Sequence, residues 1–70
     1  MLTIDQIVLY SERTIAAKFL AGDKEGLRRL QLGLGVLMDA AADANDRETA
    51  ARFRRLAAMA ADKQEALEGD

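Results

Sequence analysis

Few side chains in this chain of 70 residues could do covalent or metal chemistry, and those few stand apart from one another. The chain has no histidine and no cysteine, and Ser11 is its only serine. It therefore lacks both the imidazole that would activate a nucleophile and the thiolates that hold zinc. Asp39 and Asp43 stand one helical turn apart, as two metal ligands could, but solvated carboxylates on a polar helix face share this spacing and are more common. We expect no enzyme activity, no catalytic residue, no cofactor and no metal site.

Arginine is the other residue type that could recognise a partner, and Arg47, Arg52, Arg54 and Arg55 crowd into one short segment. A basic helix that follows a tight turn is typical of a DNA-recognition helix. The net charge is −2, however, and Arg54 falls where a helix-turn-helix motif needs an apolar residue. A solvated face with ion pairs also explains the cluster, because Glu48 precedes Arg52 at the favourable spacing of four residues. DNA binding is therefore the alternative hypothesis, not the leading one.

Helices must position these residues, because the chain has no proline and consists mainly of residues that favour helices. The segment TIDQ at 3–6 is a capping box, which predicts a helix start. Gly22 is a natural helix end. The sequence predicts a single all-α domain, 1–70, with three helices at about 4–21, 24–44 and 47–68.

Two similar segments, AGDKE at 21–25 and ANDRE at 44–48, separate the predicted helices. Asp23 can cap the second helix, and Asn45 or Asp46 can cap the third. The same capping rules applied twice explain this likeness more simply than a repeat of 23 residues does. Both segments therefore predict tight turns between helices.

Apolar side chains recur at helical spacing in the first and third predicted helices. The stripe of the first helix consists of Ile4, Ile7, Val8, Ser11, Ile15 and Phe19. That of the third consists of Ala50, Phe53, Leu56, Ala57, Ala60, Gln64 and Leu67. The alanines of the third helix predict close packing against a neighbouring helix.

The middle helix poses a physical question, because its apolar segment LQLGLGVLMD at 30–39 contains two glycines. Each internal glycine destabilises a helix by about 1 kcal/mol relative to alanine. Apolar residues cover about 240° of this helix, whereas a surface helix needs about 100°. A chain this short has little surface with which to cover the rest. We predict a homodimer in which Gly33 lets a second helix approach closely; alternatively, the glycines relieve crowding inside a monomeric three-helix bundle. Gly35 falls on a narrow polar strip.

The predicted dimer interface follows the 3-4 seam of the middle helix and the small residues beside it. Its residues are Leu27, Leu30, Gly33, Leu34, Leu37 and Ala41. The protomer would be a three-helix unit built on helical hairpins. Its dimer could be intertwined or side by side.

A protein partner must recognise side chains outside the core, and tyrosine and arginine are enriched at binding hot spots. The candidates for partner binding are Tyr10, Arg28, Arg52 and Arg55. Two alternatives remain open: Tyr10 could cover an edge of the core in the dimer, and the arginines could make solvated ion pairs.

Other sequence features bear on location. The N-terminus lacks the pattern of a signal peptide, and no uncharged run approaches the roughly 18 apolar residues of a membrane span. The mixed charges give no bias toward nucleic acid or an anionic membrane. We expect a soluble, cytoplasmic protein with no membrane partner.

Two segments, LTIDQIVLYSERTIAAKFLAGD at 2–23 and LRRLQLGLGVLMDAA at 27–41, carry a resemblance to known proteins. The chain resembles the small early proteins of transposable phages of pseudomonads, and among these the anti-activators of quorum sensing. The resemblance implies a helical homodimer in the bacterial host cell that binds a LuxR-type transcriptional activator and blocks its DNA binding. It also implies a second host target, the ATPase that assembles type IV pili.

Overall fold

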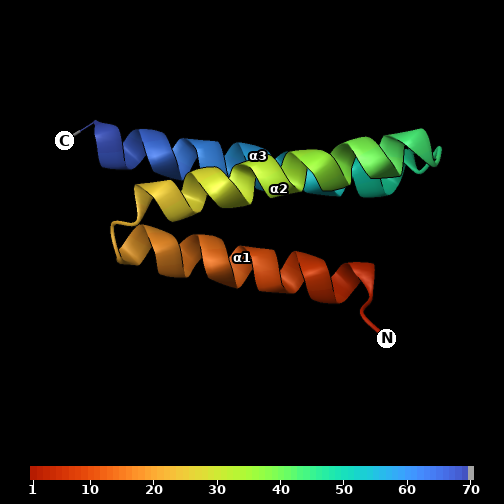
Figure 1. Cartoon of the computed structure of the whole chain (residues 1–70), viewed down its shortest axis with the longest axis horizontal. Coiled ribbons are helices and arrows are strands. Elements are labelled where there is room, and N and C mark those ends of the chain that lie inside the picture. The colour runs from red at the N-terminus through yellow and green to blue at the C-terminus, as the bar shows by residue number, and fades with distance from the viewer. Residues whose placement is uncertain (70) are drawn as a thin grey trace.

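The computed structural model describes residues 1–69 and consists of three helices that run antiparallel in sequence order (Figure 1). These are α1 (Ile4–Leu20), α2 (Lys24–Asp43) and α3 (Arg47–Glu68). The structure confirms the all-α prediction, and the predicted helix bounds agree with it to within one residue. Asp70, which the predicted domain included, lies outside the described residues.

The capping box at the start of α1 is present. The Gln6 backbone N–H donates to Thr3 Oγ1 at 3.1 Å, and the Thr3 backbone N–H donates to Gln6 Oε1 at 2.9 Å. Two of the otherwise unpaired donors at this helix end are therefore satisfied.

The turn after α1 is a Schellman motif. The Gly22 N–H donates to the Phe19 carbonyl, and the Asp23 N–H donates to the Lys18 carbonyl. Gly22 has a φ of 68°, a conformation that glycine adopts without the steric cost of a Cβ atom. The Asp23 carboxylate then accepts from the Gly26 N–H at 2.8 Å and begins α2.

The turn after α2 repeats this arrangement, with Asn45 in place of glycine. Asn45 has a φ of 65°, and asparagine tolerates this region better than most residues. The N–H groups of Asn45 and Asp46 donate to Ala42 and Ala41. Asp46, not Asn45, is the N-cap of α3, and its carboxylate accepts from the Thr49 N–H at 3.1 Å. Shared capping chemistry therefore accounts for the likeness of the two segments.

The core lies where the three helices meet. Its buried side chains are Ile15, Leu27, Leu34, Phe53, Leu56 and Ala60. The predicted stripe of α3 is confirmed, since each of its members is buried or half-buried. Ile4 is the one member of the α1 stripe that is exposed, at 40%.

The helices do not pack equally. The contact between α2 and α3 is much more extensive than either contact of α1, and it includes a hydrogen bond from Gln64 to Gln31. Figure 1 shows α2 and α3 side by side along most of their length, whereas α1 diverges from α2 toward its N-terminal end. This divergence explains the exposure of Ile4.

Polar contacts also connect α1 with α3. Arg52 Nη1 lies 2.9 Å from Asp5 Oδ1, and the Lys63 ammonium lies 4.6 Å from the centre of the Phe19 ring. The predicted pairing of Arg52 with Glu48 is wrong, because Arg52 reaches across to α1 instead.

Within the described part of the chain, no helix combines the length and apolar character that crossing a membrane requires.

Candidate protein-binding grooves

Two open grooves flank α1, one beside α2 and one beside α3. Both lie along the N-terminal half of α1, where this helix diverges from α2 (Figure 1). The shape of the grooves therefore depends on the angles between the helices, which the turns that join them help to determine. The tight turn at Gly22 holds α1 close to α2 at one end only.

The groove beside α2, called here the Tyr10 groove, is lined almost entirely by apolar atoms. Its residues are Leu2, Gln6, Ile7, Tyr10 and Leu37, and its volume is about 620 Å³. The Tyr10 side chain is 67% exposed and Leu2 is 70% exposed. Tyr10 therefore does not cover an edge of the core within the protomer. Its ring stands at the wall of an accessible apolar groove.

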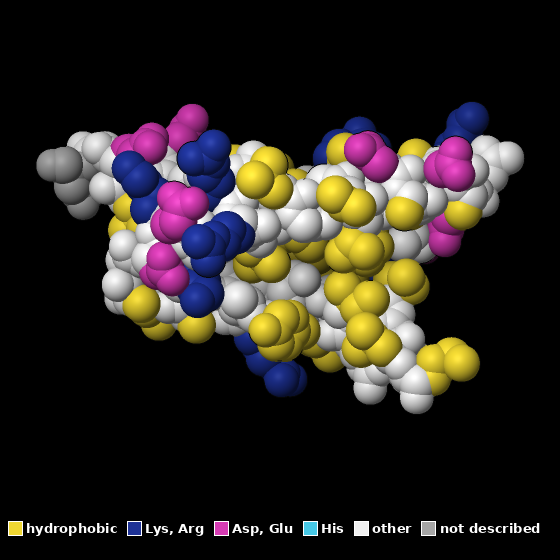
Figure 2. Space-filling view, viewed as in Figure 1, with side chains coloured by type: hydrophobic (Ala, Val, Ile, Leu, Met, Phe, Trp, Pro, Cys, Tyr) yellow, Lys and Arg dark blue, Asp and Glu magenta, His cyan; other side chains and the backbone are white. Residues whose placement is uncertain are grey.

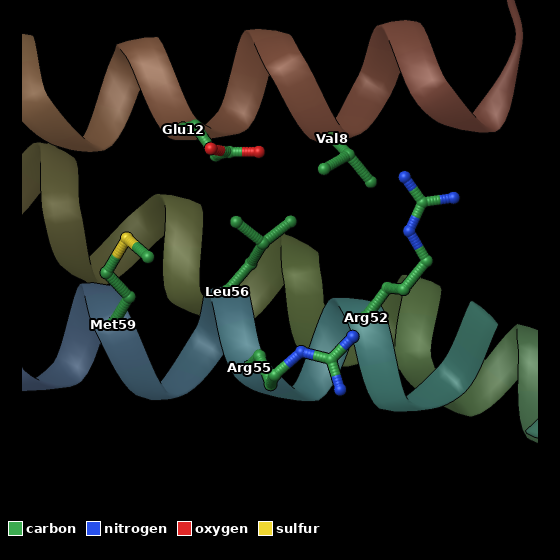
Figure 3. A pocket seen from close by; sticks show the side chains of 6 residues that line it. All are labelled: Val8, Glu12, Arg52, Arg55, Leu56 and Met59. Carbon is green, nitrogen blue, oxygen red and sulfur yellow. The ribbon is translucent and has the colours of Figure 1, made fainter. Parts of the chain in front are cut away.

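The groove beside α3, called here the Arg52 groove, combines an apolar floor with charged walls. Figure 3 shows Val8 and Leu56 facing each other across it, with Glu12 on α1 and the guanidinium of Arg52 reaching toward α1. Arg55 and Met59 complete the lining, and the volume is about 330 Å³. The pair between Arg52 and Asp5 crosses from α3 to α1, so part of the charge in this region is already neutralised within the protomer.

The four predicted partner-binding residues do not form one site. Tyr10 lines the groove on one flank of α1, whereas Arg52 and Arg55 line the groove on the other. Arg28 is exposed on α2 and lines neither groove. A single small partner segment therefore cannot contact all four residues.

The six predicted dimer-interface residues occupy three different environments. The side chains of Leu27 and Leu34 are 0% and 1% exposed, so the protomer's own helices already cover them. Leu30, Leu37 and Ala41 are half-buried, and Gly33 is exposed. A dimer that keeps this protomer fold can use Gly33 but not Leu27 or Leu34.

The apolar surface of α2 that remains accessible lies elsewhere. Leu32 is 63% exposed and Val36 is 67% exposed, which agrees with the prediction that apolar residues extend around more of this helix than its own chain can cover. A Cβ atom added to Gly33 or Gly35 would meet nothing within 4 Å. The alternative that these two glycines relieve crowding inside the protomer is therefore wrong.

Charged and apolar side chains separate on the face formed by α1 and α2. Figure 2 shows hydrophobic side chains over the middle of α2 and the N-terminal half of α1, while charged side chains gather where α2 begins and again toward the end of α2. Among residues 1–69, Asp23 and Asp46 are the carboxylates with shifted pKa values, and both serve as helix caps. The Gly26 N–H and then Lys18 lower the pKa of Asp23, while the side chain and N–H of Thr49 lower the pKa of Asp46.

Sequence reasoning missed Leu2, Gln6 and Ile7 as groove walls. Leu32 and Val36 belong to the predicted apolar arc of α2, but the predicted dimer interface leaves them out. For the last two, a signal was present: both lie roughly half a turn from the buried seam of α2. For the groove walls no local signal existed, because the groove depends on how α1 packs against α2.

No family model, curated protein or solved structure matches this chain.

Proposed function

We propose that this chain is a small dimeric interaction module that binds a bacterial host protein through the Tyr10 groove and thereby inhibits it. The observation that carries the proposal is the groove itself. Leu2, Ile7, Tyr10 and Leu37 form an open apolar lining, and exposed apolar grooves of this kind bind the apolar face of a partner helix.

Tyrosine at the wall of the groove supports a protein partner. Its ring offers a large, rigid contact area, and its hydroxyl group can donate or accept a hydrogen bond at the edge. Gln6 is the polar residue of the lining, and its side-chain oxygen is held by the Thr3 N–H in the capping box. The Gln6 amide nitrogen can therefore donate to a backbone carbonyl of the partner.

The resemblance supplies the class of partner. We propose a LuxR-type transcriptional activator as the host target, and the ATPase that assembles type IV pili as a second one. In both cases the protein would act by binding a helical surface of its target, not by catalysing a reaction.

The arrangement of the helices favours this function over DNA binding. In a helix-turn-helix motif the two helices cross at about 90–120°, whereas α2 and α3 lie antiparallel and side by side (Figure 1). Arg52 is paired with Asp5, and the net charge is −2. Arg52 is therefore partly neutralised within the protomer and less available to a DNA phosphate.

Calorimetric titration of the purified protein into a purified LuxR-type activator tests the proposal. We expect binding that Tyr10→Ala weakens at least tenfold, because the change removes the aromatic wall of the groove. Leu9→Ala is the matched control: Leu9 is 51% exposed on the same helix but does not line the groove. Melting temperatures of both variants should match wild type.

Two results would count against the proposal. One is equal binding by wild type and Tyr10→Ala. The other is binding to duplex DNA alone that weakens steeply with salt, as release of counterions requires; this result would favour the DNA-binding alternative.

A further inference from the structure

The side of α2 that faces away from the core carries a symmetric pattern of side chains. The pattern, called here the outer stripe, consists of Arg29, Leu32, Val36, Ala40 and Asp43, all of which are exposed. At 100° per residue, Val36 lies about 180° from the buried Leu27 and about 160° from the buried Leu34. The stripe is apolar in its middle, basic at one end and acidic at the other.

We propose that a second copy of this chain binds the outer stripe, with the two α2 helices antiparallel and a two-fold axis at Val36. Leu32 and Ala40 lie at equal distances along the chain on either side of Val36, and so do Arg29 and Asp43. An antiparallel pair centred on Val36 therefore brings each residue opposite its complement. The proposal deepens the proposed dimeric module by naming the surface that joins its two copies.

The side chains that meet across this axis are complementary in size. Val36 of one copy meets Val36 of the other, and the large side chain of Leu32 faces the small Ala40 of the second copy. The exposed Gly33, which has open space around it, lies beside this line and lets the helix backbones approach. This role accounts for an internal glycine that the protomer itself does not need.

The charges argue for a second copy in this orientation. Arg29 of each copy faces Asp43 of the other, which gives two ion pairs per dimer. Among residues 1–69, neither Arg29 nor Asp43 makes an ion pair within the protomer. A parallel pairing would bring Arg29 beside Arg29 and Asp43 beside Asp43, which repel each other. Such a self-complementary patch is what a two-fold interface requires.

The interface is small, which sets the expected strength. The outer stripe extends about 21 Å along the helix at 1.5 Å per residue, so a single pair of helices buries less area than a standard interface. We expect dissociation in the micromolar range.

Sedimentation equilibrium of the purified protein tests whether this surface joins two copies. We expect the average mass of wild type to rise from one protomer to two across the micromolar range. Val36→Glu should stay monomeric, because it places two like charges at the axis. Leu20→Glu is the control, since it changes an apolar side chain that is 86% exposed on α1; it should associate as wild type does.

Circular dichroism at low concentration should show the same helix content for all three proteins. A wild type that stays monomeric throughout, or a Val36→Glu variant that associates as wild type does, would overturn the proposal. The host protein is absent from this experiment, so the dimer can fail while host binding through the Tyr10 groove stands.

Charge exchange tests the orientation. Arg29→Glu or Asp43→Arg alone should weaken association several-fold, up to about tenfold at low salt. The double variant Arg29→Glu/Asp43→Arg should regain wild-type association, because it restores both pairs with reversed sign. An equimolar mixture of the two single variants should also associate better than either does alone. Failure of both recoveries would contradict the antiparallel pairing.

Cross-linking tests the register, and the absence of cysteine from the chain makes it simple. Val36→Cys should be joined to its copy by a short thiol-to-thiol reagent, because its two copies meet at the axis. Glu25→Cys lies on the same side of α2 but about 16 Å from the axis, so its two copies should not be joined. Cross-linking at both positions would indicate parallel helices, and cross-linking at neither would remove the interface.

Discussion

At the scale of single residues, two aspartates have the same role at the two turns, because each caps the N-terminus of the helix that follows. Asp23 accepts from the Gly26 N–H and pairs with Lys18 at 3.2 Å. Asp46 accepts from both the N–H and the hydroxyl of Thr49. These interactions favour the charged carboxylate, so each pKa is lowered in the folded protein.

The lowered pKa values predict a loss of stability in acid. A group whose pKa is lower in the folded state stabilises the fold above its unfolded pKa, about 3.9 for aspartate, and loses this effect as the pH falls through its folded pKa. We expect the melting temperature to fall below about pH 4. Asp23→Asn/Asp46→Asn keeps an oxygen acceptor at both caps but removes the titration. Its melting temperature should therefore fall less between pH 5 and pH 2, and an equally steep fall would contradict this explanation.

The glycines of α2 should respond differently to substitution by alanine. A Cβ atom at Gly35 meets nothing within 4 Å, so Gly35→Ala should stabilise the protomer by up to about 1 kcal/mol. At Gly26 the Cβ atom would lie 2.5 Å from the Asp23 carboxylate and 2.8 Å from Lys18. The displaced cap would offset the helical gain, so Gly26→Ala should be neutral or destabilising. Urea unfolding at low protein concentration measures both; a gain at Gly26 equal to that at Gly35 would show that this crowding is absent.

Residue-level predictions from the sequence succeeded where the interaction is local. The bond between Thr3 and Gln6 spans three residues, so the sequence alone contains both partners. The partner of Arg52 could not be found in this way, because Asp5 lies far away in the chain and reaches Arg52 only when α1 packs on α3.

At the scale of helices, α1 is the least firmly held element. It buries only Ser11 and Ile15, whereas α3 buries Ala50, Phe53, Leu56 and Ala60. Its contacts with both neighbours are less extensive than those between α2 and α3. The ion pair that crosses to it is largely exposed on its Asp5 side, and such pairs contribute less than about 1 kcal/mol.

Hydrogen exchange should reveal this difference. We expect the amides of α1 to exchange faster than those of α2 and α3 at neutral pH, because a helix with few buried contacts opens without unfolding the rest. Asp5→Ala should increase exchange in α1 and leave the middle of α3 unchanged. Uniform protection across the three helices would mean that the protomer opens only as a whole.

The two sides of α2 should tolerate truncation very differently. Leu34 is 1% exposed, so Leu34→Ala should destabilise the protomer by about 2–5 kcal/mol through the cavity it leaves. Val36 is 67% exposed, so Val36→Ala should change stability by less than about 0.5 kcal/mol. Chemical unfolding below the concentration of self-association separates these effects, and similar losses at both positions would refute the assignment of faces.

At the scale of the whole molecule, the sequence predicts more apolar surface than the chain can bury. The structure shows this excess as exposed apolar side chains. Leu2, Tyr10, Leu32 and Val36 are each more than 60% exposed. The sequence could not divide this surface between the Tyr10 groove and the outer stripe, because helical periodicity fixes faces of one helix and not the angle between two. The predicted seam of α2 therefore includes Leu27 and Leu34, which the protomer covers itself.

Inhibition of a LuxR-type activator is the decisive test of host binding through the Tyr10 groove. The measurement is the fluorescence anisotropy of labelled promoter DNA bound by the activator, as the purified protein is titrated in. We expect wild type and Leu9→Ala to release the DNA at the same concentrations, and Tyr10→Ala to need at least about ten times more protein. DNA that stays bound at saturating wild-type protein, or release by Tyr10→Ala at wild-type concentrations, would rule out inhibition through the Tyr10 groove.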